Sequence, residues 1–132
     1  MNEWNEGYFT DVTYTYGYYR ELSPVFQRFC LLLRGFEVPE PREDSTYCEL
    51  GYGQGVSINI HAASNLGQYF GTDFNPAHAA HTNKLRYASG CNASFFDDSF
   101  EEFYNRLNNE YRGGVIHLYN LIQSAFTESG RG

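Results

Sequence analysis

The chain has 132 residues, the size of one ordinary domain, and its 12 Tyr and 11 Phe predict a core built largely on aromatic rings. Its formal net charge of −7 repels phosphate backbones and anionic lipid, which argues against nucleic acid and membrane surfaces as partners. No apolar run approaches the ~20 residues of a membrane span, and residues 1–4 do not begin a secretory signal.

The first feature along the chain is an arm that precedes the main domain. Residues 8–19, YFTDVTYTYGYY, alternate as a strand or an extended segment does. A helix is predicted next, because Ser23 can cap it, Pro24 suits its first position and Gly35 can end it. The charged, proline-containing segment 38–44, VPEPRED, is then predicted to be a linker.

The linker divides the chain into an N-terminal tyrosine-rich arm and helix, 1–44, and a partial α/β domain, 45–132. Five predicted elements alternate in the second part, beginning with a strand: 46–50, 56–64, 68–72, 76–88 and 93–96. Asn75 is the expected cap of the second of these helices. The order β-α-β-α-β is typical of one half of a doubly wound, Rossmann-like parallel sheet.

Beyond Phe103 the pattern weakens. Segment 115–126, VIHLYNLIQSAF, fits a fourth strand or a short helix, and its periodicity does not decide between them. We therefore expect a sheet truncated after its third or fourth strand, as a truncated or frameshifted reading frame would give. The edge of strand 46–50 would then lie open unless 115–126 covers it, and an open edge predicts self-association or marginal stability.

Three glycines at alternate positions form the main motif, Glu49-x-Gly51-x-Gly53-x-Gly55. Glycines between a strand and a helix let a ligand approach bare backbone, next to the positive end of the helix. A dinucleotide-binding turn would carry its third glycine at position 56, where this chain has Val56. The motif instead resembles the first motif of class I S-adenosylmethionine-dependent methyltransferases. In that family the strand acid, here Glu49, favours the amino end of the ligand.

The resemblance implies a further acid at the end of each of the next two strands. Asp73 lies 18 positions beyond Gly55, where one carboxylate would accept hydrogen bonds from both ribose hydroxyls. Its alternative role is to cap the following helix, although Asn75 is better placed to do so. Asp97 or Asp98 would lie near the adenine amino group, and the other could cap the next segment. All three positions are at carboxyl ends of strands, where open parallel sheets bind ligands.

The arm extends the resemblance to residues from about 10 to 103. The stretches TDVTYTYGYYRELSP, CELGYGQG and GTDFNPAHA are similar to the N-terminal region of a bacterial methyltransferase group with a tyrosine-rich arm. The resemblance implies S-adenosylmethionine as cosubstrate and methyl transfer to an unknown acceptor. It names no catalytic residue. Two alternatives remain: a non-catalytic, truncated fragment that binds S-adenosylmethionine, and a nicotinamide-dependent oxidoreductase, which Val56 disfavours.

The histidines, cysteines and arm tyrosines carry weaker predictions. The histidines, two of them three apart on one predicted helix, lack a third metal ligand, so we predict surface histidines and no metal site: His61, His78, His81 and His117. Cys30, Cys48 and Cys91 are odd in number and far apart, which favours reduced, mostly buried thiols in a cytoplasmic protein. The arm tyrosines either pack against the core or close the cosubstrate pocket: Tyr14, Tyr16, Tyr18 and Tyr19.

Overall fold

The computed structural model describes residues 17–110 and the backbone of 116–118. A 3₁₀ turn η1, Arg20–Leu22, leads into helix α1, Pro24–Leu33. Strands and helices then alternate through β1, Thr46–Leu50, α2, Val56–Ser64, β2, Gln68–Thr72, α3, Pro76–Ser89, and β3, Ala93–Phe96. Helix α4, Phe100–Glu110, and strand β4, Ile116–Leu118, complete the described elements.

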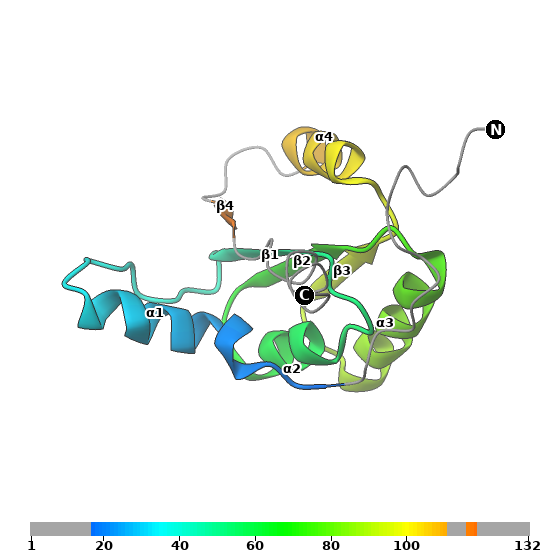
Figure 1. Cartoon of the computed structure of the whole chain (residues 1–132). Coiled ribbons are helices and arrows are strands. Elements are labelled where there is room, and N and C mark those ends of the chain that lie inside the picture. The colour runs from blue at the N-terminus through cyan, green and yellow to red at the C-terminus, as the bar shows by residue number, and fades with distance from the viewer. Residues whose placement is uncertain (1–16, 111–115, 119–132) are drawn as a thin grey trace, which may run out of the picture.

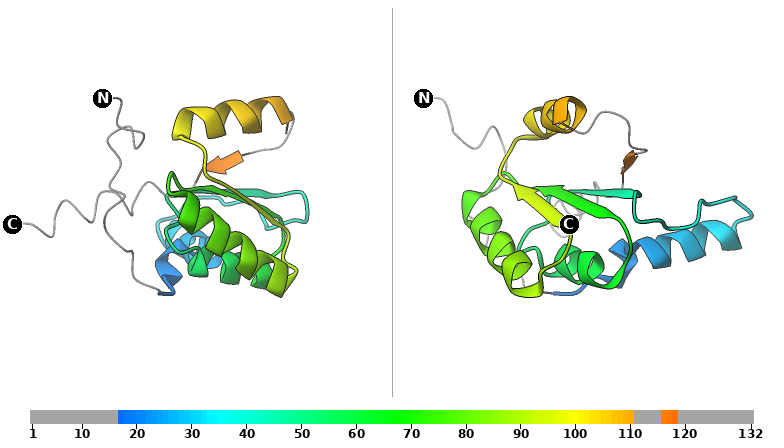
Figure 2. Two further views of the ribbon diagram at one scale, coloured as in Figure 1. Left: turned by 90° about the vertical axis from the view of Figure 1, so that its right-hand side faces the viewer. Right: turned by 180° about the vertical axis from the view of Figure 1, so that it is seen from behind.

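The strands form one parallel sheet in the order β3-β2-β1-β4. Helices α2 and α3 lie on one face and α4 lies on the other, while α1 projects from the body (Figures 1 and 2). This is an open α/β, Rossmann-like sheet, so the predicted fold class is confirmed. Within segment 115–126, residues 116–118 form a strand that pairs with β1, and the rest lies outside the described residues.

The core is built on both faces of the sheet because alternate strand residues point to opposite sides. One cluster packs β-strand tyrosines against α2 and comprises Tyr47, Tyr52, Ile58, Ala62, Tyr69, Ala93 and Phe95. The second lies under α4 and comprises Cys48, Phe70, Phe103 and Leu107. Neighbouring residues such as Tyr47 and Cys48 therefore belong to different clusters, which fixes the register of the sheet.

The predicted elements between residues 24 and 96 are confirmed to within a residue or two at their ends. Asn75 caps α3, since its Oδ1 accepts a hydrogen bond from the Ala77 N–H at 3.0 Å. Ser23 stands at the cap position of α1, but its side chain makes no capping hydrogen bond, so that prediction is wrong. Gly35 follows the helix with φ of +81°, as expected of a residue that ends one.

Helix α4 was not predicted, although its start carries a recognisable signal. The Ser99 N–H donates to Glu102 Oε2 at 2.9 Å, and the Glu102 N–H donates to Ser99 Oγ at 3.3 Å. This reciprocal pair is a capping box. Phe103 and Leu107, four residues apart, then supply the buried side of the helix.

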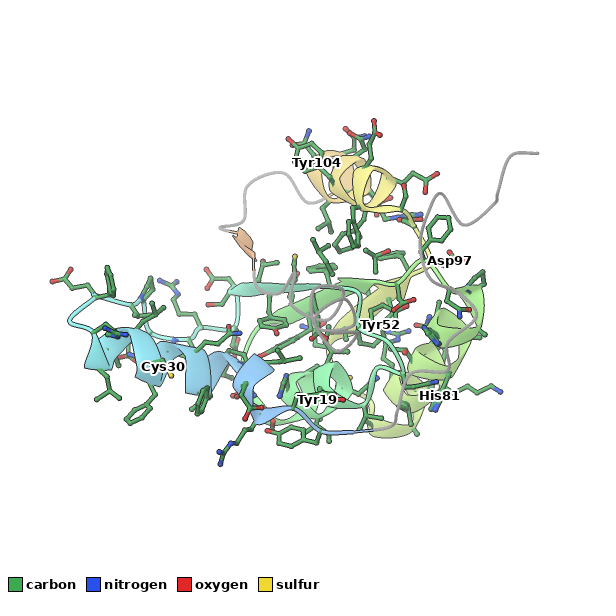
Figure 3. All side chains as sticks on the ribbon, viewed as in Figure 1. Tyr19, Cys30, Tyr52, His81, Asp97 and Tyr104 are labelled. Carbon is green, nitrogen blue, oxygen red and sulfur yellow. The ribbon has the colours of Figure 1, made fainter. Side chains whose placement is uncertain are left out.

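The arm agrees with the sequence predictions only in part. Residues 17–19 are not in a strand, and Tyr19 has the extended backbone of the other alternative. Residues 8–16 lie outside the described part of the chain. Helix α1 has no buried residue, and its Cys30, labelled in Figure 3, is exposed rather than buried. The expectation of a buried thiol is confirmed at Cys48, while Cys91 is half-buried.

Candidate functional site

The glycine turn connects the carboxyl end of β1 to the start of α2. Gly51, Gly53 and Gly55 have φ of +72°, +60° and +74°, a region that side chains strongly disfavour. The Gly51 N–H donates to the Thr72 carbonyl at 2.8 Å and thereby ties the turn to the end of β2. The alternation of glycines is therefore a backbone requirement at all three positions.

The three glycines differ in what surrounds them. A Cβ on Gly51 would meet nothing within 4 Å, so this position faces open space that a ligand can enter. A Cβ on Gly55 would lie 2.1 Å from Thr82 Oγ1, so Gly55 is required for the close packing of α2 against α3. The third glycine is thus a packing residue, and Gly51 is the position open to a ligand.

Asp73 joins the glycine turn to the start of α3. Its Oδ2 accepts the Gly53 N–H at 2.8 Å, and its Oδ1 accepts the Asn75 N–H at 3.0 Å. His78 Nδ1 lies 3.0 Å from the same Oδ1. A carboxylate offers about four acceptor positions, so these contacts leave room for a further donor. The alternative role of Asp73 as the cap of α3 belongs to Asn75.

Glu49 is the most deeply buried acid at the site, with 2% of its surface exposed. Burial raises the pKa of its carboxyl to about 8, against a smaller opposite effect of a hydrogen bond with Tyr47, and the nearby charge of Asp73 adds to the rise. Its Oε2 has no hydrogen-bond partner among the described residues. An unpaired buried oxygen is costly, so Glu49 is poised for a donor that the described residues do not supply.

The two acids that follow β3 have different surroundings. Asp98 forms a two-pronged ion pair with Arg106 of α4, with N–O distances of 2.6 and 3.0 Å. Asp97 is exposed, and no ion pair involves it among the described residues. Figure 3 shows Asp97 just beyond the end of β3. Asp97 is therefore the acid available to a ligand, whereas Asp98 holds α4 to the sheet.

Tyr52, between the first two glycines, was missed as a site residue. Its ring is buried, and its hydroxyl donates to the Phe96 carbonyl at 2.8 Å, next to Asp97. A Cβ on Gly71 would lie 2.7 Å from this ring, so glycine is needed in β2 to admit it. The charges of Asp73, Asp97 and Asp98 add to burial in raising the pKa of Tyr52. No sequence pattern predicts this contact because it joins the glycine turn to the end of β3, 44 residues further along the chain.

The prediction of surface histidines is wrong for His61 and His78, which are both buried. His78 faces Asp73, as described above. His61 lies in α2, in edge contact with the ring of Tyr18 at 5.4 Å between centroids, and burial lowers its pKa to about 4. His81 is half-buried, and the side chain of His117 lies outside the described residues. Within the described part of the chain, no cluster of histidines, cysteines and acids could hold a metal.

A cavity of about 80 Å³ lies away from these residues, between the arm and the amino ends of the strands. Its lining includes Pro24, Arg28, Pro39, Tyr47 and Tyr69. It contains no residue of the glycine turn. The open side of the candidate site is instead the space next to Gly51.

Comparison with known proteins gives one relative and similarities of fold. No protein-family model matches the chain. It is 40% identical over 122 residues to the uncharacterized protein sll1526 of Synechocystis sp., a match that covers 90% of this chain and 24% of that protein. The chain thus spans about a quarter of the length of the curated relative it matches.

Two solved structures are similar at 15% sequence identity. Precorrin-8w decarboxylase of Methanobacterium thermoautotrophicum is similar over 78% of this chain and 67% of its own, with a TM-score of 0.47. An rRNA methylase from Streptococcus thermophilus is similar over 83% of this chain and 79% of the methylase chain, with a TM-score of 0.43. Similarity at this level says nothing about activity. None of the described helices has the length and apolar character required to cross a membrane.

Proposed function

We propose that this chain binds S-adenosylmethionine at its glycine turn and forms the cosubstrate-binding half of a methyltransferase. One observation supports this most directly. Glu49, Asp73 and Asp97 stand at the carboxyl ends of three neighbouring parallel strands, around a turn whose first glycine borders open space. Open parallel sheets bind their ligands at this edge.

Each part of the ligand has a candidate partner in this arrangement. Glu49 would accept from the amino group, Asp73 from the ribose hydroxyls and Asp97 from the adenine amino group. In methyl transfer, a nucleophile of the acceptor attacks the sulfonium methyl in line, and the protein contributes mainly by positioning the two reactants. These residues assign neither the acceptor nor a general base.

The contacts of the turn favour this ligand over a dinucleotide. A diphosphate-binding turn directs free backbone N–H groups at the ligand. Here the Gly53 N–H is already donated to Asp73 at 2.8 Å. Val56 also replaces the third glycine of the dinucleotide motif. The acids around the turn suit a sulfonium and an ammonium better than a diphosphate.

Titration calorimetry with three ligands tests the proposal. S-adenosylmethionine and S-adenosylhomocysteine should bind, and NAD should not. Asp97→Ala should weaken binding because the adenine amino group loses its acceptor. The fold should tolerate this change because Asp97 is exposed. Asp44→Ala is the matched control, since Asp44 is an exposed acid of the linker, paired only with Arg42 among the described residues.

The alternatives predict different results. Binding of NAD in preference to S-adenosylmethionine would favour an oxidoreductase. Binding of S-adenosylmethionine without methyl transfer to any acceptor would identify a binding module, with the reaction belonging to a longer protein such as the relative of which this chain spans a quarter. Equal losses in Asp97→Ala and Asp44→Ala would remove Asp97 from the site.

A further inference from the structure

The environment of Glu49 favours the neutral form of its carboxyl group. The side chain is 2% exposed, and no ion pair reaches it among the described residues. An ionised carboxylate buried without a cation is strongly disfavoured. Burial accordingly raises the pKa of Glu49 to about 8.

The titratable groups around Glu49 offset this effect only in part. On the same strand, a hydrogen bond with Tyr47 lowers the pKa of Glu49 by less than burial raises it, and the Tyr47 hydroxyl also donates to the Leu22 carbonyl at 2.8 Å. After β2, Asp73 contributes a like charge. In α2, burial lowers the pKa of His61 to about 4, so that side chain is neutral near pH 7.

We propose, on the basis of the proposed function, that Glu49 selects ligands carrying an ammonium group and accepts them by releasing its own proton to solvent. The carboxyl O–H bond breaks and the proton passes to water or buffer. The resulting carboxylate, whose Oε2 is otherwise without a partner, accepts a hydrogen bond from the ligand ammonium. The positive charge that the described residues do not supply thus comes with the ligand.

Proton release makes binding depend on pH in a defined way. With a pKa of about 8, Glu49 is mostly protonated at pH 7, so binding should release most of one proton per ligand. Affinity should rise by up to about tenfold per pH unit as pH increases towards 7. It should stop rising when the ligand amino group itself loses its proton, at a pH of about 8 for an ordinary α-amino group.

The test is calorimetry at pH 7 in buffers of different ionisation enthalpy, which counts the protons exchanged. S-adenosylhomocysteine carries the ammonium group, and 5′-methylthioadenosine shares its adenosine and thioether but lacks the amino-acid part. Only the first should release most of one proton from the unmodified chain. Glu49→Gln, which keeps the size of the side chain, should release none and should bind the two ligands with more similar affinities.

Each other outcome overturns the proposal in a distinguishable way. Binding of S-adenosylhomocysteine without proton release would refute a neutral Glu49 and leave the proposed function standing. Equal proton release with both ligands would refute selection of the ammonium group. Failure of both ligands to bind would overturn the proposed function, and the role of Glu49 with it.

Discussion

At the scale of single residues, the burial of Glu49 predicts how the stability of the chain without ligand depends on pH. Its pKa in the folded chain is raised to about 8, so the unfolded chain loses this proton at lower pH than the folded one. The contribution of Glu49 to stability is therefore fully present below its usual pKa and is lost as pH rises towards 8. Between pH 5 and 8, the free energy of unfolding should fall in the unmodified chain relative to Glu49→Gln. The difference should grow by up to about 1.4 kcal/mol per pH unit.

Urea unfolding of both chains across this pH range measures that difference. Parallel profiles would mean that Glu49 is already ionised in the folded chain. Because Gln has the same shape and does not titrate, an offset that is constant with pH would report packing rather than proton binding.

Asp73 carries a second residue-scale prediction. Asp73→Ala should weaken binding of S-adenosylhomocysteine by about 1–3 kcal/mol, the cost of losing a hydrogen bond to a charged group. It should also destabilise the chain, since the N–H groups of Gly53 and Asn75 both lose their acceptor. Asp73→Asn separates the two effects because its amide oxygen can still accept from one of these N–H groups. Unchanged affinity in Asp73→Ala would exclude Asp73 from the site.

At the scale of elements, Gly51 and Gly55 form a matched pair within one turn. Their φ values are nearly equal, at +72° and +74°, so alanine at either position should cost about 1–2 kcal/mol of backbone strain. Only at Gly55 does the added Cβ meet Thr82, and overpacking should add about 1–3 kcal/mol. Denaturant unfolding of Gly51→Ala and Gly55→Ala should therefore show the larger loss in the second variant. Equal losses would mean that α2 and α3 shift apart at little cost.

Elements with strong local signals were predictable from the sequence, and contacts between elements distant in the sequence were not. The strands β1 to β3 lie between glycines and turn residues, and α3 has Asn75 and Pro76 at its start, so their ends follow from local chemistry. Helix α4 was missed because most of its residues are polar and only Phe103 and Leu107 are buried. Its start was nevertheless marked by Ser99 and Glu102.

The order and spacing of the site acids could be predicted, but their surroundings could not. The sequence cannot reveal that Asp98 pairs with Arg106, or that His78 turns inward to Asp73. These contacts depend on how α3 and α4 pack on the sheet. The burial of His61 likewise depends on the arm, which brings Tyr18 across α2.

At the scale of the whole molecule, the candidate site and the arm are held in different ways. The site lies on a sheet that has a packed core on both faces. The arm is attached to α2 near its start, where the Tyr19 N–H donates to Ser57 Oγ at 2.7 Å and Ser57 Oγ donates to the Gly17 carbonyl at 3.2 Å. Beyond that attachment α1 projects from the body (Figure 2). The site thus has the rigid support that ligand positioning requires, whereas α1 has little.

The exposed face of α1 predicts self-association. Val25, Phe29 and Leu32 follow one another at helical spacing on this face, and each is about half exposed or more, as are Leu33 and Phe36 close by. A contiguous exposed apolar surface of this kind favours association. Strand β4 offers a second surface for association, because no described strand pairs with its outer edge. However, β4 has only three residues, and short edge strands resist pairing with another chain. We therefore expect α1 rather than the sheet edge to dominate.

Light scattering over a wide range of concentration tests this expectation. The unmodified chain should scatter as a species larger than a monomer, and the double variant Phe29→Glu, Leu33→Glu should scatter as a monomer. Tyr104→Glu is the matched control, because Tyr104 is 67% exposed and lies on α4, far along the chain from α1 (Figure 3). A charge there should leave association unchanged. If the double variant still associates, the contact lies elsewhere, and the edge of β4 becomes the next place to introduce a charge. An unmodified chain that remains a monodisperse monomer would show that neither surface pairs in solution.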